Sequence, residues 1–406
     1  MQPTFRSWPI LALALACFAI GTTEFVIVGI LPEVASDLEV SLSQAGLLVT
    51  GYAMGVALGG PLVVQLTARW PGKSVLLALL GVFIGGNALS ALSPDYASLM
   101  TGRLVASLTH GSFFGIGAVI ASDIAGPSRR GAAIALMFSG LTLATVLGVP
   151  LGTLIGQAAG WRSTFVAVSA LGVLAFACVA WLLPSCPSTS TVGSAYVLAV
   201  MRRPRMWVAL LLTIFSFGGV FAAFTFIAPM LVYVTGLTPH AAAGTLFLFG
   251  LGMTLGNAVG GRLADWKLLS SLVGILLFLT VVELGVSLAL SVPALAVPMI
   301  FVWGFAAFCA VPGLQTNVVN EAQDAAAIAS TLNVSAFNIG NAAGAWFGSL
   351  LVGAGLPLRL LPTYAAGIAA VAVVIAASAY FATLRVPSRA PIVPQHPKEY
   401  LHETKT

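Results

Sequence analysis

Charged residues are scarce in this chain. Asp, Glu, Lys and Arg together make up 7% of its 406 residues, whereas hydrophobic residues make up 59% and the mean hydropathy is +1.03. A soluble domain carries roughly a quarter charged residues. So few charges do not cover a water-facing surface of this size. The composition therefore excludes a soluble globular protein and indicates one that lies in a lipid bilayer.

Cysteine and histidine are also rare, with four of each. The cysteines, at 17, 178, 186 and 309, show no metal-binding spacing, and three of them fall inside apolar runs, which favours reduced packing thiols. We therefore expect no metal site. The net charge of +5 comes from basic residues dispersed along the chain, and this dispersal argues against a nucleic-acid-binding face.

Long apolar runs take the place of charge. Each run is about as long as a helix that crosses the hydrocarbon core, roughly 20 residues, and lipid offers backbone groups no partner outside regular structure. The sequence predicts an all-α integral membrane protein with twelve transmembrane helices, at 9–31, 44–66, 75–94, 97–122, 131–157, 163–184, 206–234, 241–263, 270–291, 294–318, 326–352 and 361–384. The first run resembles a secretory signal, but it continues to Pro32 and we expect it to be retained.

Basic residues set the predicted orientation. Of the 17 Lys and Arg, Arg162 and Arg359 fall on one side of a twelve-span arrangement and Arg103 lies within a span. The other fourteen all fall on the opposite side. Cytoplasmic loops of membrane proteins carry such an excess of positive charge. We therefore expect both termini in the cytoplasm.

Two pairs of glycine-rich segments indicate an internal repeat. "GYAMGVALGG" (51–60) and "GMTLGNAVGG" (252–261) share their glycines at a separation of 201 residues, and "SGLTLATVLGVPLG" (139–152) matches "SAFNIGNAAGAWFG" (335–348) at a separation of 196. Two six-helix bundles, 1–185 and 206–385, would be joined by a cytoplasmic linker, 186–205, and followed by a cytoplasmic tail, 386–406. Parallel repeats of six are typical of transporters that bind substrate between the halves. Glycines at this spacing also pack helices.

The sequence resembles the major facilitator superfamily, and within it the drug:proton antiporter group and its bacterial sugar-efflux and chloramphenicol-resistance branch. The resemblance runs from "TTEFVIVGILPEV" through "RLVASLTHGSFFGIGAV" and "GWRSTF" to "FNIGNAAGAWFG". The family signature between spans 2 and 3 is incomplete here, because Thr67 stands where its acid belongs, although Arg69 is retained. The second half keeps Asp265 in "GRLADWK". The antiporter pattern of span 5 supplies the predicted structural residues Gly148, Pro150 and Gly152.

This resemblance implies a secondary transporter rather than an enzyme. The expected function is proton-coupled export of a small sugar-like or drug-like molecule across the bacterial inner membrane, by alternating access. The proton gradient would drive it without a cofactor, and the chain would work as a monomer. A symporter that imports a small solute is the main alternative, and a passive channel a further one. The sequence leaves substrate, direction and stoichiometry open.

Glu24 is the leading candidate for proton coupling. It lies about 24 Å along the first predicted helix from Trp8, at a rise of about 1.5 Å per residue, and hence inside the bilayer. An ionised acid near the bilayer centre costs about 2.5–3.5 kcal/mol, which favours a carboxyl that binds and releases a proton. Drug:proton antiporters also often carry an acid in span 1. The alternative is a structural carboxylate bonded to Thr22, Thr23 or a neighbouring helix.

Other polar residues inside the spans have less definite roles. Arg103 matches a family arginine linked to proton coupling, or it extends to the membrane interface. His110 is seven residues further on and shares its helix face, so it is a candidate proton relay or a neutral hydrogen-bonded histidine. Glu283 is a second embedded acid, with a structural or a coupling role. Asp123 is expected to close a cytoplasmic gate with the loop that carries Arg69.

The predicted substrate pocket lies between the halves, with apolar walls and a few polar groups. The candidate substrate-binding residues are Phe25, Tyr52, Phe113, Phe114, Phe226, Trp303, Gln315, Asn338 and Asn341. Asn338 and Asn341 are three residues apart and therefore share one helix face, which we expect to point at the pocket or at another helix. For the phenylalanines, core packing is the competing interpretation.

Overall fold

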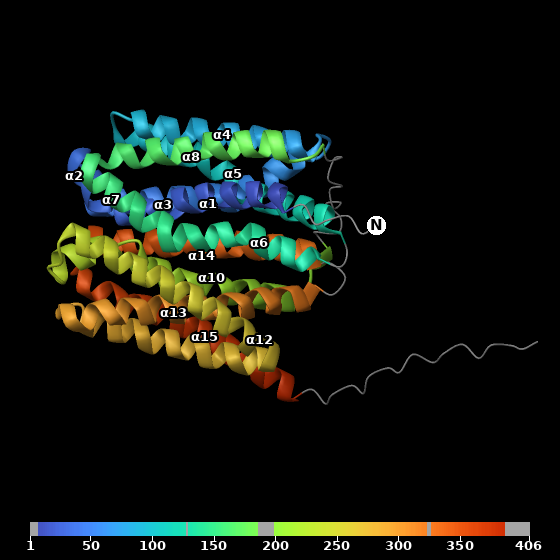
Figure 1. Cartoon of the computed structure of the whole chain (residues 1–406). Helices are drawn as coiled ribbons and strands as arrows, with labels where there is room; N and C mark the ends of the chain where they lie inside the picture. Colours follow the sequence, from blue (N-terminus) through green and yellow to red (C-terminus); the bar gives the residue numbers. More distant parts are fainter. Residues whose placement is uncertain (1–6, 127–128, 186–198, 323–325, 386–406) are drawn as a thin grey trace, which may run out of the picture.

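The computed structural model describes residues 7–126, 129–185, 199–322 and 326–385, and within these ranges all regular structure is helical (Figure 1). The predicted all-α class is confirmed. Residues 186–198 of the predicted linker, the predicted tail 386–406, Arg6 and Cys186 lie outside the described residues.

The helices follow one another with short connections. In the first part of the chain they are α1 (Trp8–Gly29), α2 (Leu31–Asp37), α3 (Leu42–Leu66), α4 (Gly72–Leu92), α5 (Tyr96–Ala125), α6 (Arg130–Leu143), the π-helical turn η1 (Ala144–Gly148), α7 (Val149–Ala159) and α8 (Trp161–Leu182). In the second part they are α10 (Pro204–Phe224), α11 (Ile227–Pro229), the π-helical turn η2 (Met230–Val234), α12 (Pro239–Ala289), α13 (Pro293–Ala322), α14 (Ala326–Gly353), the 3-10 turn η4 (Leu358–Leu360) and α15 (Leu361–Arg385).

Each of the twelve predicted apolar segments overlaps a helix. Among the described residues, ten helices are long and apolar enough to cross a membrane. One of them, α12, contains two predicted spans, 241–263 and 270–291, and its backbone leaves the helical conformation between them at Lys267. The eleventh predicted span coincides with α14, which is not among the ten. The apolar helical architecture is confirmed, and twelve crossings remain a prediction.

Helix boundaries follow from local chemistry. Ser41 begins α3 with a capping box, in which its hydroxyl accepts from the backbone N–H of Gln44 at 3.1 Å and its own N–H donates to the Gln44 side chain at 3.0 Å. Asp95 begins α5 in the same way by accepting from the N–H of Ser98 at 2.8 Å. Gly160, at φ 85°, separates α7 from α8 in a conformation that side chains disfavour. These caps lie at one end of the bundle, termed the α2 end.

Helices α1 to α8 contact one another, as do α10 to α15, and Figure 1 shows the blue-to-green set above the yellow-to-red set. They are termed the N-terminal half and the C-terminal half. The glycines of the first predicted repeat pack α3 on α5 and α12 on α13. A Cβ on Gly51 or Gly59 would meet Met100 or Leu108, and one on Gly252 or Gly260 would meet Phe301 or Cys309.

The contact partners of these glycines are thus also separated by 201 residues. The second repeat behaves likewise. A Cβ on Gly148 or Gly152 would meet Thr22 or Val26 of α1, and one on Gly344 or Gly348 would meet Gly218 or Ala222 of α10. These partners are also separated by 196 residues. The repeat is therefore a repeat of helix packing, in which small residues allow close backbone approach.

The two halves touch where α3 and α5 meet α14, where α7 and η1 meet α12, and where α1 and α2 meet α11. At the α2 end, the Ser43 hydroxyl donates to the carbonyl of Ser349 at 2.7 Å. The Gln157 amide there donates to the carbonyl of Pro239 at 3.2 Å. The halves are therefore in contact at the α2 end in this conformation.

Candidate functional site

A buried polar cluster lies inside the N-terminal half, where α1, α3 and α5 meet. It contains Glu24 from α1, Tyr52 from α3, and Arg103 and His110 from α5. Nδ1 of His110 lies 3.6 Å from Oε2 of Glu24, and the two side chains are only 6% and 10% exposed. Tyr52 packs edge-on against the imidazole, with ring centroids 6.2 Å apart. The structure thus brings together four residues that the sequence pointed to one by one.

Arg103 holds this cluster against the backbone of α1. Its guanidinium donates to the carbonyl of Thr23 at 2.5 Å and to the carbonyl of Glu24 at 3.3 Å, and it lies 4.3 Å from the ring centroid of Tyr52. The side chain is 1% exposed, so the alternative of an arginine that extends to the membrane interface is wrong. Its charge acts on the Glu24 carboxyl without a direct ion pair.

Several buried polar atoms of the cluster have no hydrogen-bond partner among the described residues. Within the described part of the chain, the Tyr52 hydroxyl, Nε of Arg103 and Nδ1 of His110 are buried without a hydrogen-bond partner. Buried polar atoms are paired in the great majority of cases, so several unpaired ones in one place call for an explanation. Here they surround a carboxyl that is slightly exposed. A site of this kind can take up a proton or a water without rearranging its neighbours.

A second layer, which the sequence did not reveal, fixes α1 against α4. The Thr23 hydroxyl donates to Oδ1 of Asn87, and the Asn87 amide donates to the carbonyl of Phe83 at 2.9 Å. The Thr22 hydroxyl instead donates to the carbonyl of Phe18 at 2.7 Å. Neither threonine therefore binds the Glu24 carboxyl, and of the structural alternative the partner on a neighbouring helix remains, with His110 of α5 at 3.6 Å. An asparagine within an apolar span was the signal available for Asn87.

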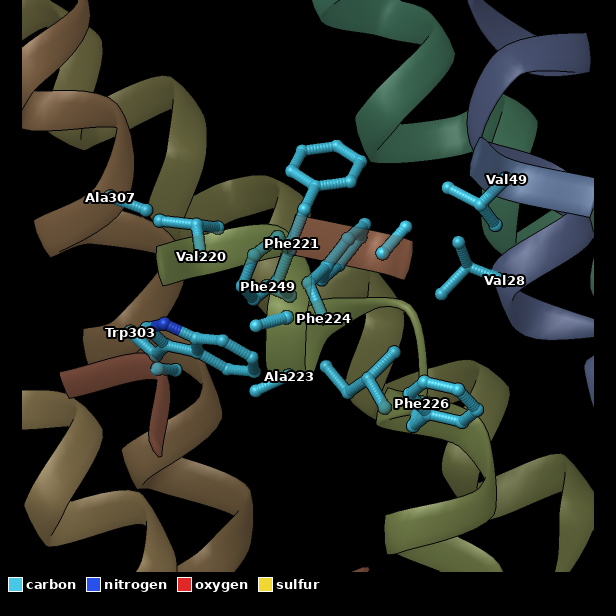
Figure 2. Close-up of a cluster of buried hydrophobic side chains, with 14 of the residues drawn as sticks. Val28, Val49, Val220, Phe221, Ala223, Phe224, Phe226, Phe249, Trp303 and Ala307 are labelled. Carbon is cyan, nitrogen blue, oxygen red and sulfur yellow. The ribbon is translucent and has the colours of Figure 1, made fainter. Parts of the chain in front are cut away.

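A small apolar void of about 10 Å³, with room for about one water molecule, lies between the halves on the other side of α1. Its lining comes from Phe25, Thr145 and Val149 of the N-terminal half and from Phe224, Leu246, Phe249 and Met253 of the C-terminal half. Phe25 packs against Phe221 and Phe224 at centroid distances of 6.3 and 6.4 Å. Phe224 and Phe249 stack at 4.7 Å, as the close-up in Figure 2 shows. Glu24 and Phe25 thus connect the polar cluster to this cavity through consecutive residues.

The remaining aromatic candidates have different surroundings. Phe113 is fully buried in the core of the N-terminal half, and Phe114 packs edge-on against His110 at 4.6 Å. Phe226 lies apart from the cavity, in contact with α3 near Gly46 (Figure 2). Trp303 is fully buried behind Phe249. Of the predicted aromatic residues, Phe25 alone is among those that line the cavity.

The predicted amide residues lie in helix interfaces of the C-terminal half. The Gln315 amide donates to the hydroxyl of Ser330 at 2.8 Å and accepts from Asn333 at 2.7 Å, while Asn333 accepts from Thr213 at 2.8 Å. This series of hydrogen bonds joins α10, α13 and α14. Asn338 donates to its own helix at Val334, and Oδ1 of Asn338 and of Asn341 is buried without a partner among the described residues. These two asparagines retain capacity for a ligand.

The predicted structural glycines pack against the turns of α1 next to Glu24, whereas the predicted gating residues lie at helix ends or at the bend of α12. Gly148 and Gly152 pack against α1, and Pro150 lies in the first turn of α7, directly after η1. Arg69 lies in the loop after α3, Asp123 in the last turn of α5, and Asp265 just before the bend of α12. Their role in gating stays a prediction.

Comparison with known proteins decides the family. Residues 13–345 match the sequence model of the Major Facilitator Superfamily. The chain belongs to this superfamily. It is a multi-pass membrane transporter and not an enzyme. The inner membrane transport protein YdhP of Escherichia coli K12 is 40% identical over 370 residues, which cover 91% of this chain and 95% of that protein.

Two further relatives carry names that state a cargo. The chloramphenicol resistance protein of Streptomyces lividans is 34% identical over 83% of this chain and 87% of its own. A probable sugar efflux transporter of Mannheimia succiniciproducens is 32% identical over 84% and 86%. Among solved structures, a bacterial homolog of the human lysosomal transporter Spinster, inward-facing and unoccupied, has a TM-score of 0.72 at 18% identity, covering 95% of this chain and 98% of that chain. This last likeness shows the shared superfamily fold.

Proposed function

We propose that this member of the superfamily is a proton-coupled exporter of a small sugar-like or drug-like molecule in the bacterial inner membrane, with both termini in the cytoplasm. The observation that carries the proposal is the Glu24 carboxyl, buried 3.6 Å from His110 and beside the charge of Arg103. An ionisable residue inside a membrane protein is by default a functional candidate. The names of two relatives, for chloramphenicol resistance and sugar efflux, support the direction.

The exchange couples two ligands, the proton and the substrate, through the single carboxyl of Glu24. In the conformation open to the cytoplasm, ionised Glu24 accompanies binding of substrate between the halves. After the halves rock, a proton from outside binds Glu24 and favours release of substrate. The protonated carrier then returns and releases the proton inside. A ligand shifts a conformational equilibrium only by its differential affinity for the two states. Two ligands with opposite preferences therefore give exchange that the proton gradient drives, without a cofactor.

The geometry offers a route for this coupling. Phe25 packs against two phenylalanines of the C-terminal half, while its neighbour Glu24 belongs to the polar cluster of the N-terminal half. Because one turn of α1 carries both residues, a small rotation of that turn changes the packing of Phe25 between the halves and the surroundings of the Glu24 carboxyl together. Arg103, which binds the carbonyls of Thr23 and Glu24, controls that rotation.

Proton release on substrate binding tests the proposal. Purified wild-type protein and Glu24→Gln are mixed in weak buffer near pH 7 with sugars, phenicols and nucleosides, and the pH change is recorded. Glu39→Gln, an exposed acid beyond the first span, is the control. Release from the wild type and the control, but not from Glu24→Gln, is expected. Equal proton release from all three proteins would show that another residue carries the coupled proton. Substrate binding without any proton release would favour a uniporter or channel.

Direction is tested separately in vesicles. Inverted vesicles with an imposed proton gradient should accumulate the compound that released a proton, and Glu24→Gln should not. Glu24→Asp should keep partial activity, because it retains the carboxyl at a shorter reach. Uptake by whole cells together with failure in inverted vesicles would identify a symporter.

A further inference from the structure

Thr23, the residue before Glu24 on α1, is held by side chains from two other helices. Its hydroxyl donates to Oδ1 of Asn87 on α4, and its carbonyl accepts from the guanidinium of Arg103 on α5 at 2.5 Å. Thr23 is 0% exposed and Asn87 is 1% exposed, so water does not compete for these bonds. Both bonds therefore act on the position of α1 itself.

The side chain of Asn87 is itself fixed in place. Its amide donates to the carbonyl of Phe83, one turn earlier on α4, at 2.9 Å. A Cβ on the preceding Gly86 would lie 2.6 Å from the backbone nitrogen of Ala106 and 2.9 Å from the carbonyl oxygen of Gly102, both on α5. Small residues allow two backbones to approach this closely. Helices α4 and α5 therefore hold Thr23 as one packed pair.

The neighbouring threonine shows what is particular about the bond to Asn87. The Thr22 hydroxyl donates to the carbonyl of Phe18 on its own helix at 2.7 Å, a common arrangement for a threonine inside a helix. Such a bond moves with α1 and does not restrain it. The hydroxyl of Thr23 crosses to Asn87 instead, and a bond to another helix resists rotation of α1 about its own axis.

The surroundings of the Glu24 carboxyl are sensitive to such a rotation. Its Oε2 lies 3.6 Å from Nδ1 of His110, whereas proton transfer between two side chains needs a separation of about 2.6–3.2 Å. The present separation exceeds that range by about 0.4 Å. A shift of the turn that carries Thr23 and Glu24 by this small amount therefore decides whether carboxyl and imidazole are in contact.

We propose that Asn87 is a positioning residue for the proton site at Glu24. It holds the hydroxyl of Thr23 and thereby sets the distance between the Glu24 carboxyl and the His110 imidazole. This inference rests on the proposed function, in which Glu24 carries the exchanged proton. A purely structural role, in which Asn87 only packs α4 against α1, predicts a lower stability with an unchanged proton site.

Infrared difference spectra of the purified protein on acidification test the role. The C=O band of the protonated Glu24 carboxyl is the one that Glu24→Gln removes. Thr23→Val replaces the hydroxyl by a methyl of the same shape, and both Thr23→Val and Asn87→Leu should displace this band. Thr23→Ser keeps the hydroxyl and should leave the band in place. Thr164→Val, which removes an equally buried bond between α8 and α7 in the same half, is the control and should also leave it. A band at its wild-type position in both Thr23→Val and Asn87→Leu would overturn the proposal.

The pH profile of the same band tests whether the two residues act as a pair. Thr23→Val and Asn87→Leu should each change the proton affinity of Glu24 by up to about tenfold, the equivalent of one net hydrogen bond. The double variant should show no larger change than either single variant, because both break the same bond. Additive changes would refute the pair. Absence of a Glu24 band in the wild type would refute the proposed proton exchange together with this inference, whereas a band that forms but ignores both substitutions refutes the positioning role alone.

Discussion

Gly46 offers a direct way to shift the conformational equilibrium of this transporter. It lies on α3 near the α2 end, where the N-terminal half meets the C-terminal half. A Cβ on Gly46 would lie 2.5 Å from Oγ of Ser349 and 2.7 Å from Cζ of Phe226, both in the other half. Phe226 is fully buried and Ser349 is 1% exposed. The added methyl of Gly46→Ala therefore clashes in this conformation, and separation of the halves at the α2 end relieves the clash.

The size of the effect follows from the packing. Ordinary contact begins near 3.4 Å, so the Phe226 ring must retreat by several tenths of an ångström in a site without free space. Overpacking of this kind costs about 1–3 kcal/mol. Because the clash exists in one conformation only, the whole penalty enters the equilibrium between the two states. We expect Gly46→Ala to favour the state open at the α2 end by about 5- to 150-fold.

Two glycines provide matched controls. Gly55 lies on the same helix, but its added Cβ would meet Ser107 of the same half at 2.0 Å. Gly55→Ala should therefore lower the thermal unfolding midpoint without a shift of the conformational equilibrium. Gly85 of α4 is exposed and has no atom within 4 Å of the added Cβ. Gly85→Ala should change neither property, apart from a small gain in helix propensity.

Spin-label distances between the halves measure the shift. Ser36 and Ala354 are exposed at the α2 end, one in each half, and cysteines there carry the labels in a background without native cysteines. Gly46→Ala should move the distance distribution toward longer values, whereas both control variants keep the wild-type distribution. A wild-type distribution in Gly46→Ala, in a protein that elutes as a single species, would refute the argument that Phe226 closes this end. An equal shift in Gly55→Ala would refute the assignment of its contact to one half.

Three further outcomes are expected. Arg103→Lys should lower the unfolding free energy by about 1.5–3 kcal/mol, the value of one hydrogen bond to a charged group, seen as a lower thermal midpoint, because a lysine does not span two carbonyls and the Tyr52 ring. Gln315→Leu should lower the free energy of unfolding by about 0.6 kcal/mol per lost interhelical bond and leave the substrate KM unchanged, and a raised KM would restore Gln315 to the pocket. Asp37 accepts from the Arg162 guanidinium at 2.5 Å and from the Trp161 indole at 3.0 Å, and these bonds hold the pKa of its carboxyl below the usual value; the stabilisation is therefore complete above the ordinary pKa of about 4 and is lost as the pH falls through the lowered pKa. The difference in unfolding free energy between wild type and Asp37→Asn, about 0.2–1 kcal/mol for a half-exposed pair, should thus be constant from pH 7 to 5 and disappear in stronger acid.

The all-α membrane class and the internal repeat could both be predicted from the sequence, because both depend on local pattern. Apolar run length alone placed all twelve predicted spans on helices, and the glycine spacing predicted which helices are equivalent. Helix irregularities were not visible in the same way. The π-helical turns η1 and η2 are backbone adjustments within apolar runs, which hydropathy does not distinguish from continuous helix, and the short helix α2 follows the end of the first predicted run.

The polar cluster was predictable in its members and not in its contacts. Glu24, Arg103 and His110 stood out because charged and titratable residues inside a span are rare. Their arrangement depends on how α1 packs against α5, and sequence spacing does not encode such contacts. Arg103 therefore binds the backbone of α1 rather than the carboxylate. The cavity wall was missed for the converse reason, since Phe224 and Phe249 are ordinary apolar residues in an apolar chain.

The same repeat that relates the two halves also shows where they differ. Glu24 corresponds at the 196-residue separation to Val220, and Arg103 corresponds at the 201-residue separation to Gly304. A Cβ at Gly304 would lie 2.3 Å from the carbonyl of Phe249, so α12 and α13 approach too closely for an arginine there. That close approach is also what brings Phe249 against Trp303 in the cavity wall. At this position the C-terminal half therefore has an aromatic contact where the N-terminal half has the buried polar cluster, and this difference follows from helix packing.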